Sequence, residues 1–187
     1  MLTRLCLIRH AETEWNRLDR LQGRKDIALN AAGVTKTREV AARLDAHDWD
    51  GVVSSPLLRA SQTARTLREV AGIADLGTEP LLVERTYGAA EGLTPLECAS
   101  RFPDGAVPGL ESRSAVAARG LAAMAALQAK PPGARLLVVT HGSLIKCVLM
   151  LLRPDLPETT LNVGLLSGTL LEADDDGWKV VFVGRPI

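Results

Sequence analysis

Residues 135–142 read RLLVVTHG, and this stretch decides the fold class. Its four consecutive apolar residues are typical of a strand covered on both faces, because a half-exposed strand alternates polar and apolar residues. Similar runs are Leu5–Ile8, which is followed directly by Arg9-His10, and Gly51–Ser54. Segments with helical periodicity lie between these runs. Strands that alternate with helices indicate a mainly parallel sheet between helical layers.

Each expected helix begins at a residue typical of a helix N-terminus, namely Asn30, Ser55 with Pro56, Ser112 and Ser143. Near the end of the chain, Thr169–Ala173 and Lys179–Val183 flank the turn sequence DDDG at 174–177. This is a β-hairpin signal, and it adds an antiparallel edge strand. We therefore expect a three-layer α/β/α sandwich, with a mainly parallel sheet and an antiparallel edge strand, in which residues 1–187 form a single domain.

The composition excludes several classes of function. Lys and Arg number 22 and Asp and Glu number 22, so the formal net charge is zero. This argues against a nucleic-acid partner and against a basic membrane anchor. No apolar run reaches the length of a membrane span, and the first residues do not resemble a secretory signal. We expect a cytoplasmic protein without a membrane partner. The expected edge strand within Thr169–Val183 could pair with a second copy of the chain, so a homodimer is one possible partner arrangement.

The cysteines predict neither a disulfide nor a metal site. Cys6, Cys98 and Cys147 are scattered, odd in number and without CxxC spacing. We expect each of them to be a small residue in the core. A chain without a predicted disulfide fits a reducing compartment. Nothing in the sequence indicates a metal-ligand cluster or a cofactor.

Two histidines share one position relative to the predicted strands. His10 and His141 each directly follow a strand, Arg9 precedes His10, and Arg59 lies at the start of a helix that follows a strand. In a parallel sheet all four meet at the carboxyl edge, where open α/β sheets bind ligands. The helix starts after Ser55 and Gly142 are expected to add free backbone N–H groups there.

Phosphoryl transfer through histidine is the chemistry that this set supports. A neutral imidazole is a competent nucleophile, and two nearby arginines disfavour its protonation. The same arginines can clamp phosphate oxygens, and a second imidazole can donate to them. The leaving oxygen also needs a proton from a carboxylic acid. By position in the chain, Glu84, Glu91 and Glu12 are all candidates.

Four segments, in order, resemble the motifs of the histidine phosphatase superfamily, which includes the cofactor-dependent phosphoglycerate mutases. They are RHAET at 9–13, SSPLLRASQTA at 54–64, ERTYG and EGLT at 84–88 and 91–94, and VTHG at 139–142. The match is ordered and covers nearly the whole chain. It is therefore far more specific than any one of the four segments alone.

The resemblance implies a role for each matching residue. His10 would become the phosphohistidine, and Arg9, Arg59 and His141 would form the phosphate pocket around it. Glu84 would be the proton donor and then the general base for the attacking water. Further substrate contacts would come from Asn16, Gln22, Gly23 and Gly142. The family needs no metal for this chemistry.

Two departures from the family pattern bear on function. Ala11 replaces the usual glycine, which fits if the backbone angle there is ordinary. The chain also lacks the long insertion and the Arg-Arg pair with which mutases hold a phosphoglycerate carboxylate. We therefore expect a phosphomonoesterase that acts on a small phosphorylated metabolite. The alternatives are a phosphoglycerate mutase and a non-catalytic phosphate-binding module, although the latter predicts a damaged catalytic set. The substrate is not readable from the loops at 17–26 and 93–110.

Overall fold

The computed structural model describes residues 2–129, 133–175 and 177–187 and is built on a six-stranded sheet with the order β3-β2-β4-β1-β5-β6. The strands are β1 (Thr3–Arg9), β2 (Gly51–Ser54), β3 (Asp75–Thr78), β4 (Arg135–Thr140), β5 (Ser167–Asp174) and β6 (Gly177–Pro186). Strands β1 to β4 pair in parallel, whereas β5 pairs antiparallel with β1 and with β6. The predicted α/β sheet with antiparallel strands at one edge is confirmed. Asp176 of the predicted hairpin turn lies outside the described residues.

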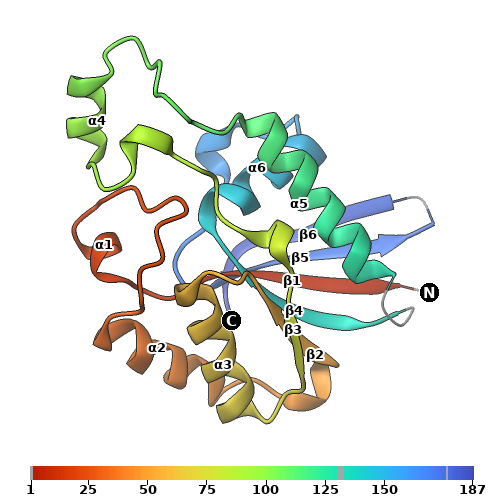
Figure 1. Ribbon diagram of the computed structural model, residues 1–187. Coiled ribbons are helices and arrows are strands. Elements are labelled where there is room, and N and C mark those ends of the chain that lie inside the picture. Colours follow the sequence, from red (N-terminus) through yellow and green to blue (C-terminus); the bar gives the residue numbers. More distant parts are fainter. Residues whose placement is uncertain (1, 130–132, 176) are drawn as a thin grey trace.

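Helices cover both faces of this sheet (Figure 1). The helices are α1 (Glu14–Arg17), α2 (Ala31–Ala41), α3 (Leu58–Ala71), α4 (Pro95–Arg101), α5 (Arg113–Gln128) and α6 (Gly142–Leu152). Helices α2 and α3 pack together on one face, and α5 and α6 pack together on the other. The short helices α1 and α4 lie beyond the carboxyl ends of the parallel strands. Their loops therefore surround the edge where the ligand was expected.

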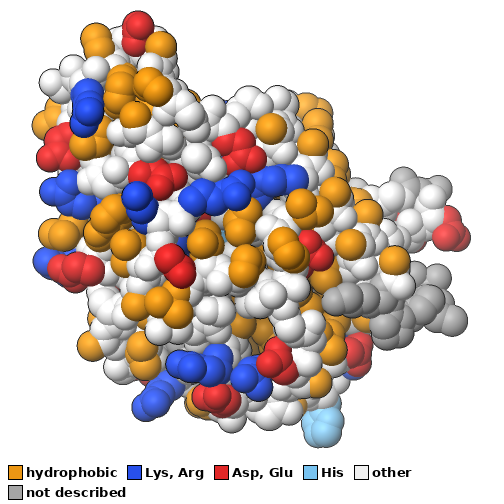
Figure 2. All heavy atoms as spheres, viewed as in Figure 1, with side chains coloured by type: hydrophobic (Ala, Val, Ile, Leu, Met, Phe, Trp, Pro, Cys, Tyr) orange, Lys and Arg blue, Asp and Glu red, His pale blue; other side chains and the backbone are white. Residues whose placement is uncertain are grey.

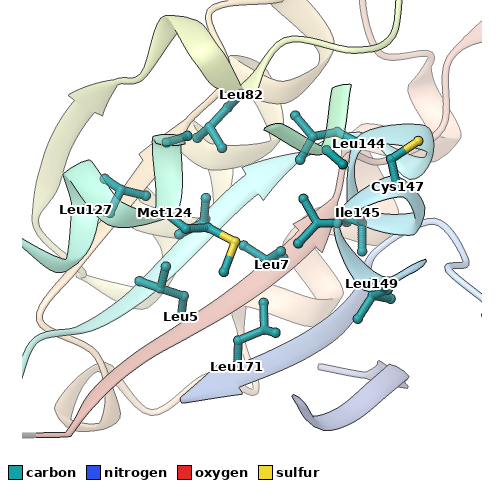
Figure 3. Packing of buried hydrophobic residues seen from close by; sticks show 14 of the residues in the cluster. Leu5, Leu7, Leu82, Met124, Leu127, Leu144, Ile145, Cys147, Leu149 and Leu171 are labelled. Carbon is teal, nitrogen blue, oxygen red and sulfur yellow. The ribbon is translucent and has the colours of Figure 1, made fainter. Parts of the chain in front are cut away.

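The two faces of the sheet carry separate apolar clusters. Along β1, Leu5 and Leu7 point to the cluster under α5 and α6, and Cys6 and Ile8 point to the one under α2 and α3. Figure 3 shows Leu5 and Leu7 packed against side chains from α5 and α6. All four residues are buried. Strand β1 is therefore packed against helices on both faces, which fixes the position of its carboxyl end. Burial of a large apolar side chain such as leucine or isoleucine contributes about 1.5–3 kcal/mol to the free energy of unfolding.

Two of the four expected helix starts are confirmed, and two differ. The side chains of Asn30 and Ser112 cap α2 and α5 by accepting the N–H groups of Gly33 and Ala115. The prediction that Ser55 caps α3 is wrong, because this helix begins at Leu58. The Ser55 hydroxyl instead accepts the N–H of Leu57 and bonds to the ring of His141.

The other differences are small. Helix α6 begins at Gly142 rather than Ser143, with His141 as its cap residue. Strand β3 was not expected, because its sequence DLGT is exposed throughout and carries no apolar periodicity. Within the described part of the chain, no helix is both long enough and apolar enough to cross a membrane.

Candidate active site

His10 lies at the carboxyl edge of the sheet, where hydrogen bonds to its backbone N–H and to both ring nitrogens hold it in one orientation. Its backbone N–H donates to the carbonyl of Thr140, which joins the ends of β1 and β4. Its Nδ1 lies 2.7 Å from the carbonyl of Ala11, and a carbonyl accepts only, so Nδ1 carries the proton. The Nε of Arg59 donates to His10 Nε2 at 3.2 Å. The lone pair of His10 is therefore on Nε2, which faces a guanidinium.

His141 lies beside His10 with its ring centroid 5.3 Å away. Its Nε2 is 2.8 Å from the hydroxyl of Ser55. The only other partner of that hydroxyl in the described residues is the N–H of Leu57, which is a donor, so His141 Nε2 is the one acceptor within reach of the hydroxyl proton and we assign Ser55 as the donor. This leaves the proton of a neutral His141 on Nδ1, which is buried and has no partner in the described residues. His141 therefore offers one N–H donor without a partner in the described residues, on the ring that lies beside His10.

Burial keeps both imidazoles neutral. Burial, and then the charges of Arg59 and Arg9, hold the pKa of His10 well below its ordinary value. Burial, and then the neighbouring groups Arg59, His10, Arg119 and Arg9, also hold the pKa of His141 well below its ordinary value. The sequence predicted that nearby arginines lower the pKa of His10, and they do lower it. Desolvation by burial is the larger cause.

Two arginines bring positive charge to the edge. Arg59 is fully buried, and its terminal nitrogens donate to the carbonyls of Gly23 and Lys25. Arg9 donates through Nη1 to the carbonyl of Val163, while its buried Nε has no partner in the described residues. Burial lowers the pKa of both arginines, and the charge of Glu84 opposes that change. The two guanidiniums are thus fixed in place, with donor atoms left for an oxyanion.

Of the three candidate acids, Glu84 lines the cavity that contains Arg9 and Gly142, a space of about 350 Å³. Glu91 instead accepts the backbone N–H groups of Arg24 and Tyr87. Glu12 accepts the side-chain amide of Asn30 at the start of α2. Glu84 is therefore distinguished by its position on this cavity beside Arg9, because neither Glu91 nor Glu12 lines the cavity.

The N-terminus of α6 holds Glu84. The N–H groups of Ser143 and Leu144 each donate to the carboxylate at 3.2 Å, and the N–H of Arg85 donates at 2.7 Å. At α3, the N–H of Leu58 donates to Asp26. The expectation of free N–H groups at both helix starts is wrong for these donors, because carboxylates from two loops already occupy them.

The polar residues expected to contact substrate lie in loops around this cavity. Asn16 lines it, but its Oδ1 accepts from the backbone and hydroxyl of Thr13 in the cap of α1, which leaves its amide NH₂ as the available donor. Gln22 is buried, and its Oε1 has no partner in the described residues. Asn16 therefore shares the cavity with Arg9, whereas Gln22 does not line it and precedes Gly23, whose carbonyl accepts from Arg59.

Two glycines permit close approaches at the edge, and Ala11 lies there with an ordinary backbone angle. Gly23 has φ of +54°, and a Cβ there would lie 2.1 Å from the carboxylate of Glu91. A Cβ at Gly142 would lie 3.2 Å from the Nε of Arg9. Among the described non-glycine residues only Asp19 and Leu166 have positive φ, so the backbone angle of Ala11 is ordinary, as expected. Gly23 thus allows its carbonyl to reach Arg59.

Arg119 on α5 is part of this site although no sequence motif contained it. Its guanidinium donates to the carbonyls of Leu81, Val83 and Glu84 and forms an ion pair with Glu111 at 2.8 Å. The Nε of Arg24 also donates to the carbonyl of Glu84. Two guanidiniums therefore fix the backbone that carries the candidate acid. The available signal was a single charged residue within the largely apolar stretch at 114–128.

We expect replacement of Arg119 by methionine to impair catalysis more than binding. Loss of three carbonyl contacts lets the Glu84 backbone shift, and a misplacement of about 1 Å can cost about 100-fold. Arg119→Met should therefore lower kcat by about 10- to 100-fold for substrates with poor leaving groups, with a smaller change in KM. Arg119→Lys should not restore it, because lysine lacks the planar fork. Exposed Arg38→Met on α2 is the control, and an equal loss there would contradict the assignment.

The stability of the protein should fall as the pH falls below about 6.5. The folded state keeps His10 and His141 neutral because their pKa values are lowered, whereas the unfolded chain protonates them near pH 6.5. The unfolded state then binds more protons, which costs about 1.4 kcal/mol per pH unit for each histidine. Urea unfolding between pH 7 and pH 5 measures this slope. His10→Asn should reduce the slope by about one proton, and an unchanged slope would refute the account.

Comparison with known proteins assigns the family. The sequence model of the histidine phosphatase superfamily (branch 1) matches residues 5–185. The chain belongs to this superfamily. It is 33% identical over 182 residues to an uncharacterized phosphatase, PhoE, of Bacillus subtilis, covering 96% of this chain and 93% of that protein. It is 35% identical over 159 residues to the probable phosphoglycerate mutase GpmB of Proteus mirabilis, covering 79% of this chain and 74% of that one.

The fold agrees with solved structures of the superfamily. A mycobacterial glucosyl-3-phosphoglycerate phosphatase in complex with VO₃ superposes with a TM-score of 0.85 and 31% sequence identity, covering 98% of this chain and 99% of the other. Phosphatases and mutase-like proteins therefore both occur among the relatives. Within residues 2–129, 133–175 and 177–187, no group of three or more His, Cys, Asp or Glu side chains could hold a metal ion. Cys6, Cys98 and Cys147 are free thiols.

Proposed function

We propose that this histidine phosphatase superfamily member is a metal-independent phosphomonoesterase, acting on a small phosphorylated metabolite through a phosphohistidine on His10. The observation that carries the proposal is the Nε2 lone pair of His10 beside buried donors. Arg59 already donates to that nitrogen, and Arg9 Nε and His141 Nδ1 have no other partner in the described residues. Buried unpaired donors are costly and rare, and a bound oxyanion would satisfy both.

In the first step, His10 Nε2 would attack phosphorus while the ester oxygen leaves. The hydrogen bond that Arg59 Nε–H donates to the imidazole would shift to a phosphoryl oxygen, and Arg59 would keep its proton. The two hydrogen bonds from Arg59 to backbone carbonyls would hold the guanidinium in place. Arg9 and His141 would donate to the other oxygens, where charge increases in the transition state. Glu84, which lines the cavity together with Arg9, would give its proton to the departing alkoxide.

In the second step, water would replace the alcohol. Glu84, now ionised, would take a proton from the water as its oxygen attacks phosphorus, and the bond from phosphorus to His10 Nε2 would break. Inorganic phosphate would leave, and Glu84 and His10 would return to their starting states. The cavity of about 350 Å³ lies at the lower end of the usual size for small-molecule sites, which fits a small metabolite.

A phosphoglycerate mutase is the second candidate, favoured by the match to GpmB. A mutase must keep its phosphorylated intermediate from water and hold the phosphoglycerate carboxylate. The chain has no Arg-Arg pair for that carboxylate. We therefore expect hydrolysis to exceed isomerisation.

Phosphate release from p-nitrophenyl phosphate and a panel of phosphorylated metabolites tests the proposal, each measured with and without a metal chelator. We expect turnover that the chelator does not change. A parallel assay with 3-phosphoglycerate and a bisphosphate primer measures isomerisation. Isomerisation faster than phosphate release would favour the mutase, and no turnover of any substrate would overturn the proposal.

A further inference from the structure

The side chain of Ser55 lies against the ring of His141 because strands β2 and β4 hold the two residues in register. Ser54 pairs with Val139 in the parallel ladder, and the N–H of Ser55 donates to the carbonyl of Val139 at 2.9 Å. Ser55 and His141 are both fully buried. The contact of 2.8 Å between the Ser55 hydroxyl and His141 Nε2 therefore belongs to the packed carboxyl edge of the sheet.

The bonding of this hydroxyl distinguishes between the two neutral forms of His141. A neutral imidazole carries a proton on one nitrogen and a lone pair on the other, and the hydrogen bond at one nitrogen sets which is which. With the proton on Nδ1, the Ser55 hydroxyl accepts from the N–H of Leu57 and donates to Nε2, so the hydroxyl and Nε2 are both paired. With the proton on Nε2, the hydroxyl would accept twice, and its own proton would be buried without an acceptor in the described residues, which is costly.

The tautomer decides what His141 presents to a bound phosphoryl group. Its Nδ1 is buried and has no partner in the described residues, on a ring whose centroid lies 5.3 Å from that of His10. A proton on this nitrogen would donate to a phosphoryl oxygen, whereas a lone pair would repel that oxygen. The doubly protonated ring is disfavoured, because burial, and then the neighbouring positive groups, hold the pKa of His141 well below its ordinary value. The position of the single proton is therefore what matters.

We infer that Ser55 is a positioning residue that fixes the tautomer of His141, so that Nδ1–H rather than a lone pair faces the phosphoryl group. This inference rests on the proposed phosphatase function. The carbonyl of Ala11 fixes the tautomer of His10 in the same way, through Nδ1. The two imidazoles thus carry their protons on the same ring atom but present opposite nitrogens to the substrate. His10 presents a lone pair and His141 presents a donor.

Nitrogen-15 NMR of the imidazole rings tests the tautomer directly. The chain has three histidines, of which only His47 is exposed, and Figure 2 shows histidine atoms at a single place on the face that it draws. So few rings can be assigned by substituting them one at a time. We expect the wild-type protein to carry the His141 proton on Nδ1. Ser55→Ala should move it to Nε2 in most molecules, and Ser55→Thr should keep the wild-type form. A wild-type proton on Nε2, or an unchanged tautomer in Ser55→Ala, would overturn the inference.

The kinetic effect of Ser55→Ala should fall on kcat. Loss of one preorganised oxyanion donor costs about 10²- to 10³-fold, and His141 would keep its donor in a minority of molecules. We therefore expect kcat for p-nitrophenyl phosphate to fall about tenfold with a smaller change in KM, and Ser55→Thr to recover most of the loss. Ser61→Ala is the matched control, because the Ser61 hydroxyl bonds to the carbonyl of Leu58 within α3. An equal loss in Ser61→Ala, or none in Ser55→Ala, would contradict the role of Ser55.

Failure of the proposed function and failure of this inference give different results. If the wild-type protein hydrolyses no phosphomonoester, the proposed function fails, and the ring spectra together with calorimetric titration of inorganic phosphate still test Ser55. Ser55→Ala should bind phosphate more weakly than the wild-type protein by about threefold or more, because one donor to the anion is lost. Equal phosphate affinity in the two proteins would then reject the role of Ser55.

Discussion

Replacing His10 with alanine should reduce phosphate release by about 10⁴-fold or more, because the reaction loses its nucleophile rather than one of several stabilising contacts. The remaining donors, on Arg9, Arg59 and His141, would still bind the phosphoryl group. KM should therefore change much less than kcat. Steady-state assays with p-nitrophenyl phosphate measure both quantities. Hydrolysis at the wild-type rate would refute the assignment of His10.

A covalent intermediate gives an independent readout for the same residue. Rapid quenching at alkaline pH should trap phosphate on the wild-type protein and none on His10→Ala, and mass spectrometry of peptides should place it on His10. His47→Ala is the matched control, because His47 is exposed and lies before the amino end of β2, away from the carboxyl edge of the sheet. This variant should retain both turnover and labelling. Labelling of any other residue would contradict the proposed first step.

Much of this fold and site could be predicted from local sequence. The run at 136–139 is apolar on consecutive residues because β4 has neighbours on both sides and helices on both faces. Polar residues appear where such a strand ends, so Arg9-His10 and His141 identify the carboxyl edge directly. Parallel pairing of β1 with β4 then brings the two imidazoles together. These signals are local and require only the fold class.

The parts that could not be predicted depend on contacts between distant residues. Ser55 resembles a helix cap, but its hydroxyl bonds to a histidine 86 residues away. The N–H groups of α6 resemble a free anion site, but they hold Glu84, which lies about 60 residues earlier. Arg119 acts through backbone carbonyls, which every residue possesses and no motif can specify. Tertiary contacts thus override the local preference at each of these positions.

Glu84→Gln should produce effects that depend on the leaving group. An alkyl phosphate such as glycerol 3-phosphate needs a proton on its departing oxygen, so its turnover should fall by about 10²- to 10⁴-fold. The p-nitrophenolate ion departs without a proton, so the first step with p-nitrophenyl phosphate should be largely preserved. The second step still lacks its base. Stopped-flow measurement should therefore show a burst of p-nitrophenol, about one per active site, followed by slow turnover.

The burst separates an acid-base role from a structural one. Glutamine keeps a carbonyl oxygen for the N–H groups of Arg85 and Leu144, but it places an amide NH₂ opposite the N–H of Ser143. A purely structural disturbance would slow both steps and give no burst. Glu91→Gln is the matched control, because its amide oxygen can still accept from Arg24 and Tyr87. A leaving-group dependence and a burst in Glu91→Gln rather than in Glu84→Gln would transfer the acid role to Glu91.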